Sequence, residues 1–547
     1  MARWLVFLLP LFCTPLFSQR LVEATIVDKE TKKPVSFASI GIIGTSKGTS
    51  SNLNGQFSIS VNETDSLKIT CVGYESLTLS SGLALTIVDL APIVTQLSEI
   101  VILDRAINAK KVLRKAFANI DLNYNDRPFL QQFFYRHYCK DGAAYGRLIE
   151  AAIDVWKTSG YRTVQHAAGE KEEIRVTQLR RSLDKTEMAQ GHDPISVGNI
   201  LQADIVAYQT DKRSEHMSFY TDVSNLRTDF DKYDFVCKGI TYYDGLEVYE
   251  ITYQNKKDSV LTTTGKYLDL VEIKGTLFIT TGGYAFVRTE ESKSYGTNSL
   301  LTSTFYRKVN DRYYPYHIIR QGESEYADKR VHSVHLELMS MEIKTDPTVK
   351  IVGQLPNREA LLSIPYDSTF WKSNSILKTT PLEDDIIRDL GGGVSLDKQF
   401  LRYHQFEMNT RDGGVNGEEK FKWLLADSKG NRILYLLAWT GNLQAYLVDV
   451  ELAKRLQKKY RNKVTFVFLS LEDDEKRWKE VIEKFSLYTD GVINYRIGSR
   501  SKTAASLAIS EAPGFMLLTH DGEMIRPTKR PSDPSLEEDL LKLIGQK

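Results

Sequence analysis

The chain has few cysteines, no apolar run long enough for a membrane span, and no excess of either charge. Four cysteines in 547 residues exclude a small disulfide-rich scaffold. Beyond a short apolar run at residues 4–17, no apolar run reaches the roughly 18 residues that a transmembrane helix needs. We therefore do not expect an integral membrane protein. The 71 Lys and Arg balance 70 Asp and Glu, and this balance gives no sign of a nucleic-acid partner.

The composition is that of an ordinary globular protein. Hydrophobic residues make up 42%, charged residues 26% and aromatic residues 10%. These values exclude a mainly disordered, collagen-like or coiled-coil chain. At roughly 150 residues per domain, the length predicts three or four domains.

Residues 1–19 have the pattern of a secretory signal peptide. Arg3 precedes an apolar run at residues 4–17, and the small residue Ser18 lies near the expected cleavage point. Cys13 follows a phenylalanine, whereas lipoprotein signals place a small residue there. We therefore expect cleavage near Ser18 or Gln19, and export to the periplasm, the outer membrane or the cell surface.

Three cysteines would remain after this cleavage: Cys71, Cys139 and Cys237. Their spacing matches no metal or redox motif. Each lies in a strand-like run, which favours a small buried hydrophobic side chain over a nucleophile. An odd number leaves at least one free thiol, and a Cys139–Cys237 disulfide stays open as an alternative.

Residues 20–103 alternate short β-branched runs with turn residues, which predicts a small antiparallel β-sandwich. Asn54-Gly55 is a strong hairpin signal. The motifs are Asp28-x-x-Thr31-x-x-Pro34, Phe37-Ala-Ser39, Gly44-Thr-Ser46-x-Gly48, Asn52-x-Asn-Gly55-x-Phe57 and Val72-Gly-Tyr74. With them the segment resembles the carboxypeptidase-regulatory-like domain of Bacteroidota envelope proteins. The resemblance implies a transthyretin-like sandwich without catalysis of its own.

The histidines do not predict a zinc site. His404 and Glu407 have a zinc-ligand spacing, and His520 follows much later. A zinc peptidase places more structure after its last ligand than the 27 residues that follow His520. His332 and His335 lie three apart in a predicted strand and so point to opposite faces. We predict neither a metal nor a cofactor.

Residues 104–345 predict a helix at 105–120, followed by an antiparallel β-rich region. Gly282-Gly283 and Asn310-Asp311 are hairpin turns between successive strand-like runs. The charged segment 169–190 is predicted to be a loop or an exposed helix.

Tyrosines are frequent in this region, and they allow two readings. They could stack on a glycan, or they could pack inside the sheet as strand-forming residues with polar tips. Packing is favoured, because strand aromatics generally pack against their neighbours. The residues concerned are Tyr242, Tyr243, Tyr313, Tyr314 and Tyr316.

Residues 346–414 form a mixed linker region. A helix is predicted at 381–390, and glycines 391–393 are expected to end it and act as a hinge. They are not a phosphate loop, because no Gly-Lys-Ser/Thr follows.

Residues 415–547 predict an α/β domain. Strands at 433–439 and 464–469 flank a helix at 443–460, and a hairpin about Asp521-Gly522 precedes a closing helix at 535–544. This order is thioredoxin-like. The predicted fold class is therefore a multidomain chain: an N-terminal β-sandwich, an antiparallel β-rich α+β middle domain and a C-terminal thioredoxin-like domain.

Particular motifs make the last domain resemble TlpA-type thioredoxin-like proteins. They are Ala426-Asp-Ser-Lys-Gly430, Leu434-Tyr-Leu-Leu-Ala-Trp439, Phe466-Val-Phe-Leu-Ser470 and Ala512-Pro513-x-Phe515. That family places Cys-x-x-Cys after the tryptophan, whereas this chain has Thr440-Gly-Asn-Leu443 and no cysteine after Cys237. Thiol–disulfide exchange needs a thiolate, so dithiol chemistry in this domain is excluded.

The resemblance also implies a cis peptide bond at Ala512-Pro513 and a peptide-binding groove formed by Ala512, Pro513, Trp439 and Thr440. We expect no catalytic residue. The predicted function is a non-catalytic binding or assembly role in the cell envelope, with a protein or peptide partner. The alternative is an accessory to thiol–disulfide redox, through Cys139, Cys237 or a partner's thiols, or to glycan or peptide handling.

Overall fold

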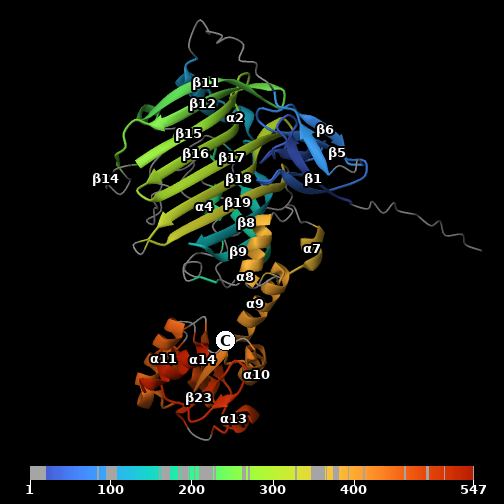
Figure 1. The fold of residues 1–547 in the computed structure, drawn as a ribbon. Coiled ribbons are helices and arrows are strands. Elements are labelled where there is room, and N and C mark those ends of the chain that lie inside the picture. The colour runs from blue at the N-terminus through green and yellow to red at the C-terminus, as the bar shows by residue number, and fades with distance from the viewer. Residues whose placement is uncertain are drawn as a thin grey trace, which may run out of the picture. The chain divides into compact units, whose positions relative to one another are not determined.

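A computed structural model describes most of the chain from residue 20 onward (Figure 1). The described residues are 20–82, 86–93, 107–158, 160–161, 173–182, 185–186, 195, 197–201, 204–207, 226, 230–261, 267–268, 271–326, 329–345, 364, 366–373, 381–391, 394–410, 413–430, 432–460, 463–487, 492–509 and 512–545. The predicted signal peptide lies outside them. The chain forms two compact units, residues 1–400 and 401–547. The finer domain boundaries, at residues 103 and 345, stay predictions.

The N-terminal part of the first unit is a sandwich of two small sheets, ordered β4-β1-β7 and β3-β2-β5-β6. Ile26, Ile40 and Ile69 are fully buried between them. Every pairing is antiparallel except β1 with β7; β6 belongs to the other sheet, so the chain returns to β1 in the same direction. The strands are β1 (Arg20–Asp28), β2 (Ser39–Ile42), β3 (Gly48–Ser50), β4 (Gln56–Val61), β5 (Ser66–Thr70), β6 (Leu77–Ser80) and β7 (Ile87–Leu90).

A ten-stranded sheet dominates the first unit, in the order β10-β9-β8-β19-β18-β17-β16-β15-β12-β11 (Figure 1). Two meanders, β8 to β10 and β11 to β19, meet where β8 pairs with β19. All neighbours are antiparallel, which confirms the predicted antiparallel sheet. The strands are β8 (Phe129–Asp141), β9 (Ala144–Lys157), β10 (Glu173–Arg181), β11 (Tyr233–Tyr243), β12 (Leu246–Asn255), β15 (Val271–Thr280), β16 (Phe286–Tyr295), β17 (Asn298–Val309), β18 (Arg312–Glu325) and β19 (Val331–Lys344).

Helix α1 (Ala109–Ala118) packs its apolar side on one face of this sheet. Val112, Leu113 and Phe117 join the strand side chains in a single core. The side chain of Asn108 caps the helix by accepting from the backbone N–H of Lys111 at 2.9 Å. The predicted start at residue 105 lies outside the described residues. Short helices α2 (Ile120–Asn123) and α4 (Val197–Leu201) complete this side.

The prediction for residues 169–190 is wrong where the structure describes them, because residues 173–181 form strand β10. Its arginines do not mark a loop, although the Arg175 side chain is 55% exposed. They pair with acids of the neighbouring strand: Arg175 binds Asp154 at 2.6 Å, and Arg180 binds Glu150 at 2.6 Å. Those acidic partners lie on another strand, so the local sequence alone suggests exposure.

The predicted linker region contains three helices in the described residues: α7 (Ser368–Ser373), α8 (Pro381–Gly391) and α9 (Leu396–Thr410). Helix α8 confirms the helix predicted at 381–390 and ends at the first of the three glycines; the other two lie outside the described residues. Ile386 and Leu396 pack on Leu148 of β9.

The second unit is a five-stranded sheet in the order β22-β21-β20-β23-β24. β20, β21 and β22 are parallel, and β23 and β24 form an antiparallel hairpin. This order confirms the predicted β-α-β unit followed by a hairpin and a helix; β22 was not predicted. The strands are β20 (Ile433–Trp439), β21 (Val464–Ser470), β22 (Ile493–Arg496), β23 (Gly514–Leu518) and β24 (Met524–Ile525).

Helices cover both faces of this second sheet. α11, α12 and α14 share one core with it, and α10 and α13 share the other. The helix predicted at 443–460 divides into a 3₁₀ turn, η2, and α11. The helices are α10 (Gly417–Ser428), η2 (Leu443–Tyr446), α11 (Leu447–Tyr460), α12 (Glu475–Lys484), α13 (Lys502–Ser506) and α14 (Ser535–Gly545). Over the described residues, no helix combines the length and apolar character needed to cross a membrane.

Candidate functional site

The loop that follows β20 is closed by a tyrosine. Trp439 ends the strand and is fully buried, and Thr440 after it is half-buried. The backbone N–H of Thr440 donates to the hydroxyl oxygen of Tyr446 at 3.0 Å, and that hydroxyl lies 3.5 Å from the Thr440 carbonyl oxygen. Leu443, three residues after Thr440, is buried in the core. The two positions with the Cys-x-x-Cys spacing are thus Thr440, whose backbone binds the Tyr446 hydroxyl, and Leu443, which lies in the core.

The sheet register brings the four predicted groove residues together. The last paired residues of β20 and β23 are Ala438 and Gly514. The next residue on one strand is Trp439 and on the other Pro513, which has no N–H to continue the ladder. The predicted cis bond between Ala512 and Pro513 is present. Pro513 is exposed, so the proline edge faces solvent.

We call Thr440, Gly441, Asn442, Ala512 and Pro513 the loop–proline surface. A charged side chain that the sequence did not single out lies beside it. A Cβ atom on Gly441 would come within 2.6 Å of an Nη atom of Arg477, so the guanidinium packs directly on this glycine. Arg477 is exposed, and its Nε lies 3.3 Å from a carboxylate oxygen of Glu472. Arg477 is 36 positions from Gly441, and no local pattern signals their contact.

The cysteines that the structure describes lie in surroundings that do not favour their thiolate forms. All three described cysteines belong to the first unit, and none of them forms a disulfide in the described structure. Burial raises the pKa of Cys71 to about 11 and also raises the pKa of Cys237; Cys139 is fully buried. Because β8 and β11 are seven strands apart, Cys139 and Cys237 are separated by roughly 30 Å. A disulfide needs Cα atoms within about 7 Å, so these two do not pair in this structure.

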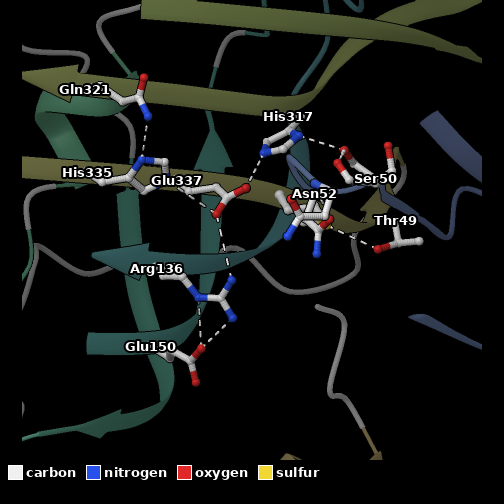
Figure 2. A network of polar contacts seen from close by, with 12 residues as sticks. Thr49, Ser50, Asn52, Arg136, Glu150, His317, Gln321, His335 and Glu337 are labelled. Carbon is white, nitrogen blue, oxygen red and sulfur yellow. Dashed lines mark hydrogen bonds and ion pairs between the residues drawn. The ribbon is translucent and has the colours of Figure 1, made fainter. Parts of the chain in front are cut away.

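A cluster of polar side chains in the first unit is centred on strands β8, β18 and β19, and Figure 2 shows its centre. Glu337 of β19 is 6% exposed and lies among three cationic or titratable side chains. Its Oε1 is 2.6 Å from Nε2 of His317, and its Oε2 is 3.7 Å from Nε2 of His335 and 4.0 Å from Nη1 of Arg136. Burial opposes its charge, but hydrogen bonds from the two histidines hold the pKa of Glu337 well below its usual range.

The cluster continues across strands β9 and β10. Arg136 of β8 donates to Glu150 of β9 at 2.7 Å, and Arg180 of β10 binds the other oxygen of Glu150 at 2.6 Å. Arg180 also reaches Asp397 at 2.9 Å, and its guanidinium stacks 4.4 Å above the ring of Trp371. Burial alone would raise the pKa of Glu150, yet Arg180 and Arg136 lower it.

The sandwich contributes the last member. Oγ of Ser50 in β3 lies 2.7 Å from Nδ1 of His317. We call Ser50, His317, His335, Glu337, Arg136, Glu150, Arg180 and Asp397 the buried polar network. Its residues come from elements far apart in sequence, and sequence reasoning missed all of them as a group. Only a strand-pairing map would have shown that Glu337, Arg136, Glu150 and Arg180 stand in register.

Ser50, His317 and Glu337 have the order of partners found in serine hydrolases. Their burial contradicts that activity, since Ser50 and His317 have no exposed surface, whereas a nucleophile must reach its substrate. Ser50 belongs to the sandwich and His317 to the sheet, so an opening between them that admits a substrate would also separate the two side chains. The geometry fits a structural connection between sandwich and sheet.

Further contacts tie the sandwich to the same sheet. The hydroxyl of Tyr316 donates to the Phe37 carbonyl at 2.8 Å, and Nη2 of Arg307 donates to the Ser46 carbonyl at 2.7 Å. A Cβ on Gly48 would lie 1.7 Å from Nη1 of Arg307, so only glycine allows this approach. The Gly44-Thr-Ser46-x-Gly48 motif is therefore the part of the sandwich that covers a buried arginine.

Four of the five tyrosines named above are buried, as the favoured reading predicts, whereas Tyr242 is half-buried. Tyr243, Tyr313, Tyr314 and Tyr316 are at most 5% exposed and so provide no platform for a sugar. In the residues that the structure describes, no three metal-binding side chains gather. His332 binds Asp141 whereas His335 stacks on Tyr138, so they face different partners. The side chains of His404 and Glu407 lie outside the described structure.

Comparison with known proteins gives similarities for parts of the chain. Residues 22–102 match the model of the CarboxypepD_reg-like domain, which confirms the N-terminal resemblance. No curated protein matches the chain at a significant level.

Solved structures similar to this chain include thiol-disulfide oxidoreductases. A protein titled as one, from Bacteroides vulgatus, is 30% identical and covers 22% of this chain and 80% of its own, with a TM-score of 0.20. One from Bacteroides fragilis is 26% identical and covers 20% and 80%, with a TM-score of 0.18. A secreted disulfide oxidoreductase of Mycobacterium tuberculosis is 19% identical and covers 22% and 86%, with a TM-score of 0.19. Each of these similarities covers about a fifth of this chain.

Proposed function

We propose that this chain is an exported envelope protein that acts by binding, and that residues 415–547 are a TlpA-type thioredoxin-like domain without redox activity. The proposal includes a Bacteroidota origin and removal of residues 1–19 during export. The two interaction modules are the loop–proline surface and the N-terminal sandwich.

One observation carries the proposal. The position after Trp439, where the resembled family has its attacking thiolate, holds Thr440, and the hydroxyl of Tyr446 binds the backbone on both sides of it. No cysteine follows Cys237 in the sequence. Disulfide exchange cannot begin without a thiolate, while the exposed residues Asn442 and Pro513 of the loop–proline surface stay accessible to a partner.

An extended peptide segment of another envelope protein is the partner that this surface fits. The β20–β23 pairing ends at Gly514, so Ala512 and the exposed Pro513 lie beyond the paired residues. Backbone groups outside a ladder can hydrogen-bond to an extended chain. The alternative role as a redox accessory has weaker support, because the described thiols are buried or have raised pKa values.

The test is an insulin-type disulfide reduction assay on the full-length chain with added reductant. We expect the wild-type rate to equal that of a variant in which Cys71, Cys139 and Cys237 are alanine. Turnover above this cysteine-free control would overturn the proposal. The double variant Thr440→Cys with Leu443→Cys, checked for folding by circular dichroism, shows whether the remaining groove supports exchange once thiols are supplied.

A further inference from the structure

Helix α1 carries a purely cationic outer face. Its ten residues include Lys110, Lys111, Arg114 and Lys115 and no acidic residue. The buried side holds the apolar residues that pack on the sheet, and Lys111, Arg114 and Lys115 are exposed. We call these four residues the cationic face. The chain as a whole has a formal net charge of +1, so this concentration is local.

The contacts of the cationic face leave its charge available. The one ion pair among them in the described structure joins Lys110 to Asp231 at 3.7 Å, and Asp231 is 95% exposed. Lys115 rests on Tyr284, with its Nζ 3.0 Å from the hydroxyl and 4.7 Å from the ring centre. Arg114 lies 5.4 Å from the Phe230 ring centre. Aromatic partners hold these side chains in place without neutralising them.

An exposed leucine lies on the same side. Leu122 in α2 is 68% exposed, the highest value among the large hydrophobic side chains described. Hydrogen bonds from the Asn119 N–H to the Lys115 carbonyl and from the Asn123 N–H to the Asn119 carbonyl carry the helical pattern through the joint. At 3.6 residues per turn, Leu122 therefore follows Lys115 by about two turns, on the same face.

From this juxtaposition we propose that the cationic face and Leu122 form a peripheral docking surface for an anionic lipid bilayer. Lysine and arginine attract anionic headgroups, and an apolar side chain beside them enters the acyl boundary. An acidic polysaccharide would use the charges but gain nothing from an exposed leucine, so the lipid surface is the better fit. This inference does not depend on whether the second unit has redox activity.

The test is sedimentation of the chain starting at residue 20 with vesicles, because the apolar segment at residues 4–17 would itself enter a bilayer. We expect binding to vesicles that contain phosphatidylglycerol and little binding to pure phosphatidylcholine. Each lost cation should weaken partitioning about fivefold, so Lys111→Gln with Arg114→Gln should weaken it about 25-fold. Leu122→Ser should weaken it roughly tenfold.

The matched control is Lys29→Gln with Lys33→Gln, which removes the same charge from exposed positions of the sandwich. It should bind like the wild type. Equal binding to both vesicle types, an equal loss in the control, or retained binding by the double variant would each overturn the proposal. Binding to heparin that Leu122→Ser leaves unchanged, without preference for anionic vesicles, would assign the face to acidic polysaccharide instead.

Discussion

The buried polar network of the first unit and the loop–proline surface of the second differ in two properties, the side chains they hold and their access to solvent. The network holds side chains that chemistry uses, a serine, two histidines and carboxylates at hydrogen-bonding distance, but its central members are sealed from solvent. The loop–proline surface is open, yet a threonine and a leucine stand at the positions that would need thiols. Within the described residues, reactive groups and access are thus separated between the two units.

The largest expected effect comes from breaking the network at Glu150. Glu150→Ala leaves the buried Arg136 and the partly exposed Arg180 without their shared carboxylate, and breaking a buried ion pair costs about 3–5 kcal/mol. Urea unfolding of the full chain should show an earlier transition for the first unit only. Asp89→Ala is the control, since its pair with Lys32 is exposed and should contribute almost nothing. A transition unchanged by Glu150→Ala would contradict the network's structural role.

A smaller effect is expected from the sandwich side. Ser50→Ala removes the partner of His317 Nδ1, and an unsatisfied buried group costs about 1–3 kcal/mol. Ser58→Ala is matched to it in strand context and burial, but the Ser58 hydroxyl has no hydrogen-bond partner in the described structure. Thermal unfolding should therefore show a lower Tm for Ser50→Ala than for the wild type, and an unchanged Tm for Ser58→Ala. Equal effects would mean that Ser50 acts through packing alone.

The smallest expected effect is on the pH dependence of the unfolding free energy, and it concerns Glu337. Its folded pKa is lowered, so its charge stabilises the fold above its unfolded pKa, and this contribution is lost as pH falls through the folded value. One such group changes the unfolding free energy by at most about 1.4 kcal/mol per pH unit. Glu337→Gln should give a shallower loss of stability below pH ~4.5 in urea titrations. A slope identical to the wild type would show that other carboxylates govern acid unfolding.

The comparison also explains what the sequence could predict. The residues around the loop–proline surface belong to short motifs, Trp439 with its following loop and Ala512-Pro513, so a resemblance could name Trp439, Thr440, Ala512 and Pro513 as a candidate groove. The buried polar network depends on strand pairing between positions as distant as Ser50 and His317, and no local pattern records it. Strand β10 was missed for the same reason: Arg180 looks solvated until Glu150 is known to lie opposite.

The pairing of β8 with β19 has a consequence for how the chain is made. Phe133 of β8 aligns with Ser340 of β19, and the two are 207 positions apart in the sequence. Until residues near 340 leave the ribosome, the β8 edge that pairs with β19 has no partner. Pairings of such separation form slowly, and unpaired strand edges invite association with other chains. The architecture therefore requires that the unpaired edge of β8 be kept from other chains until β19 has been made.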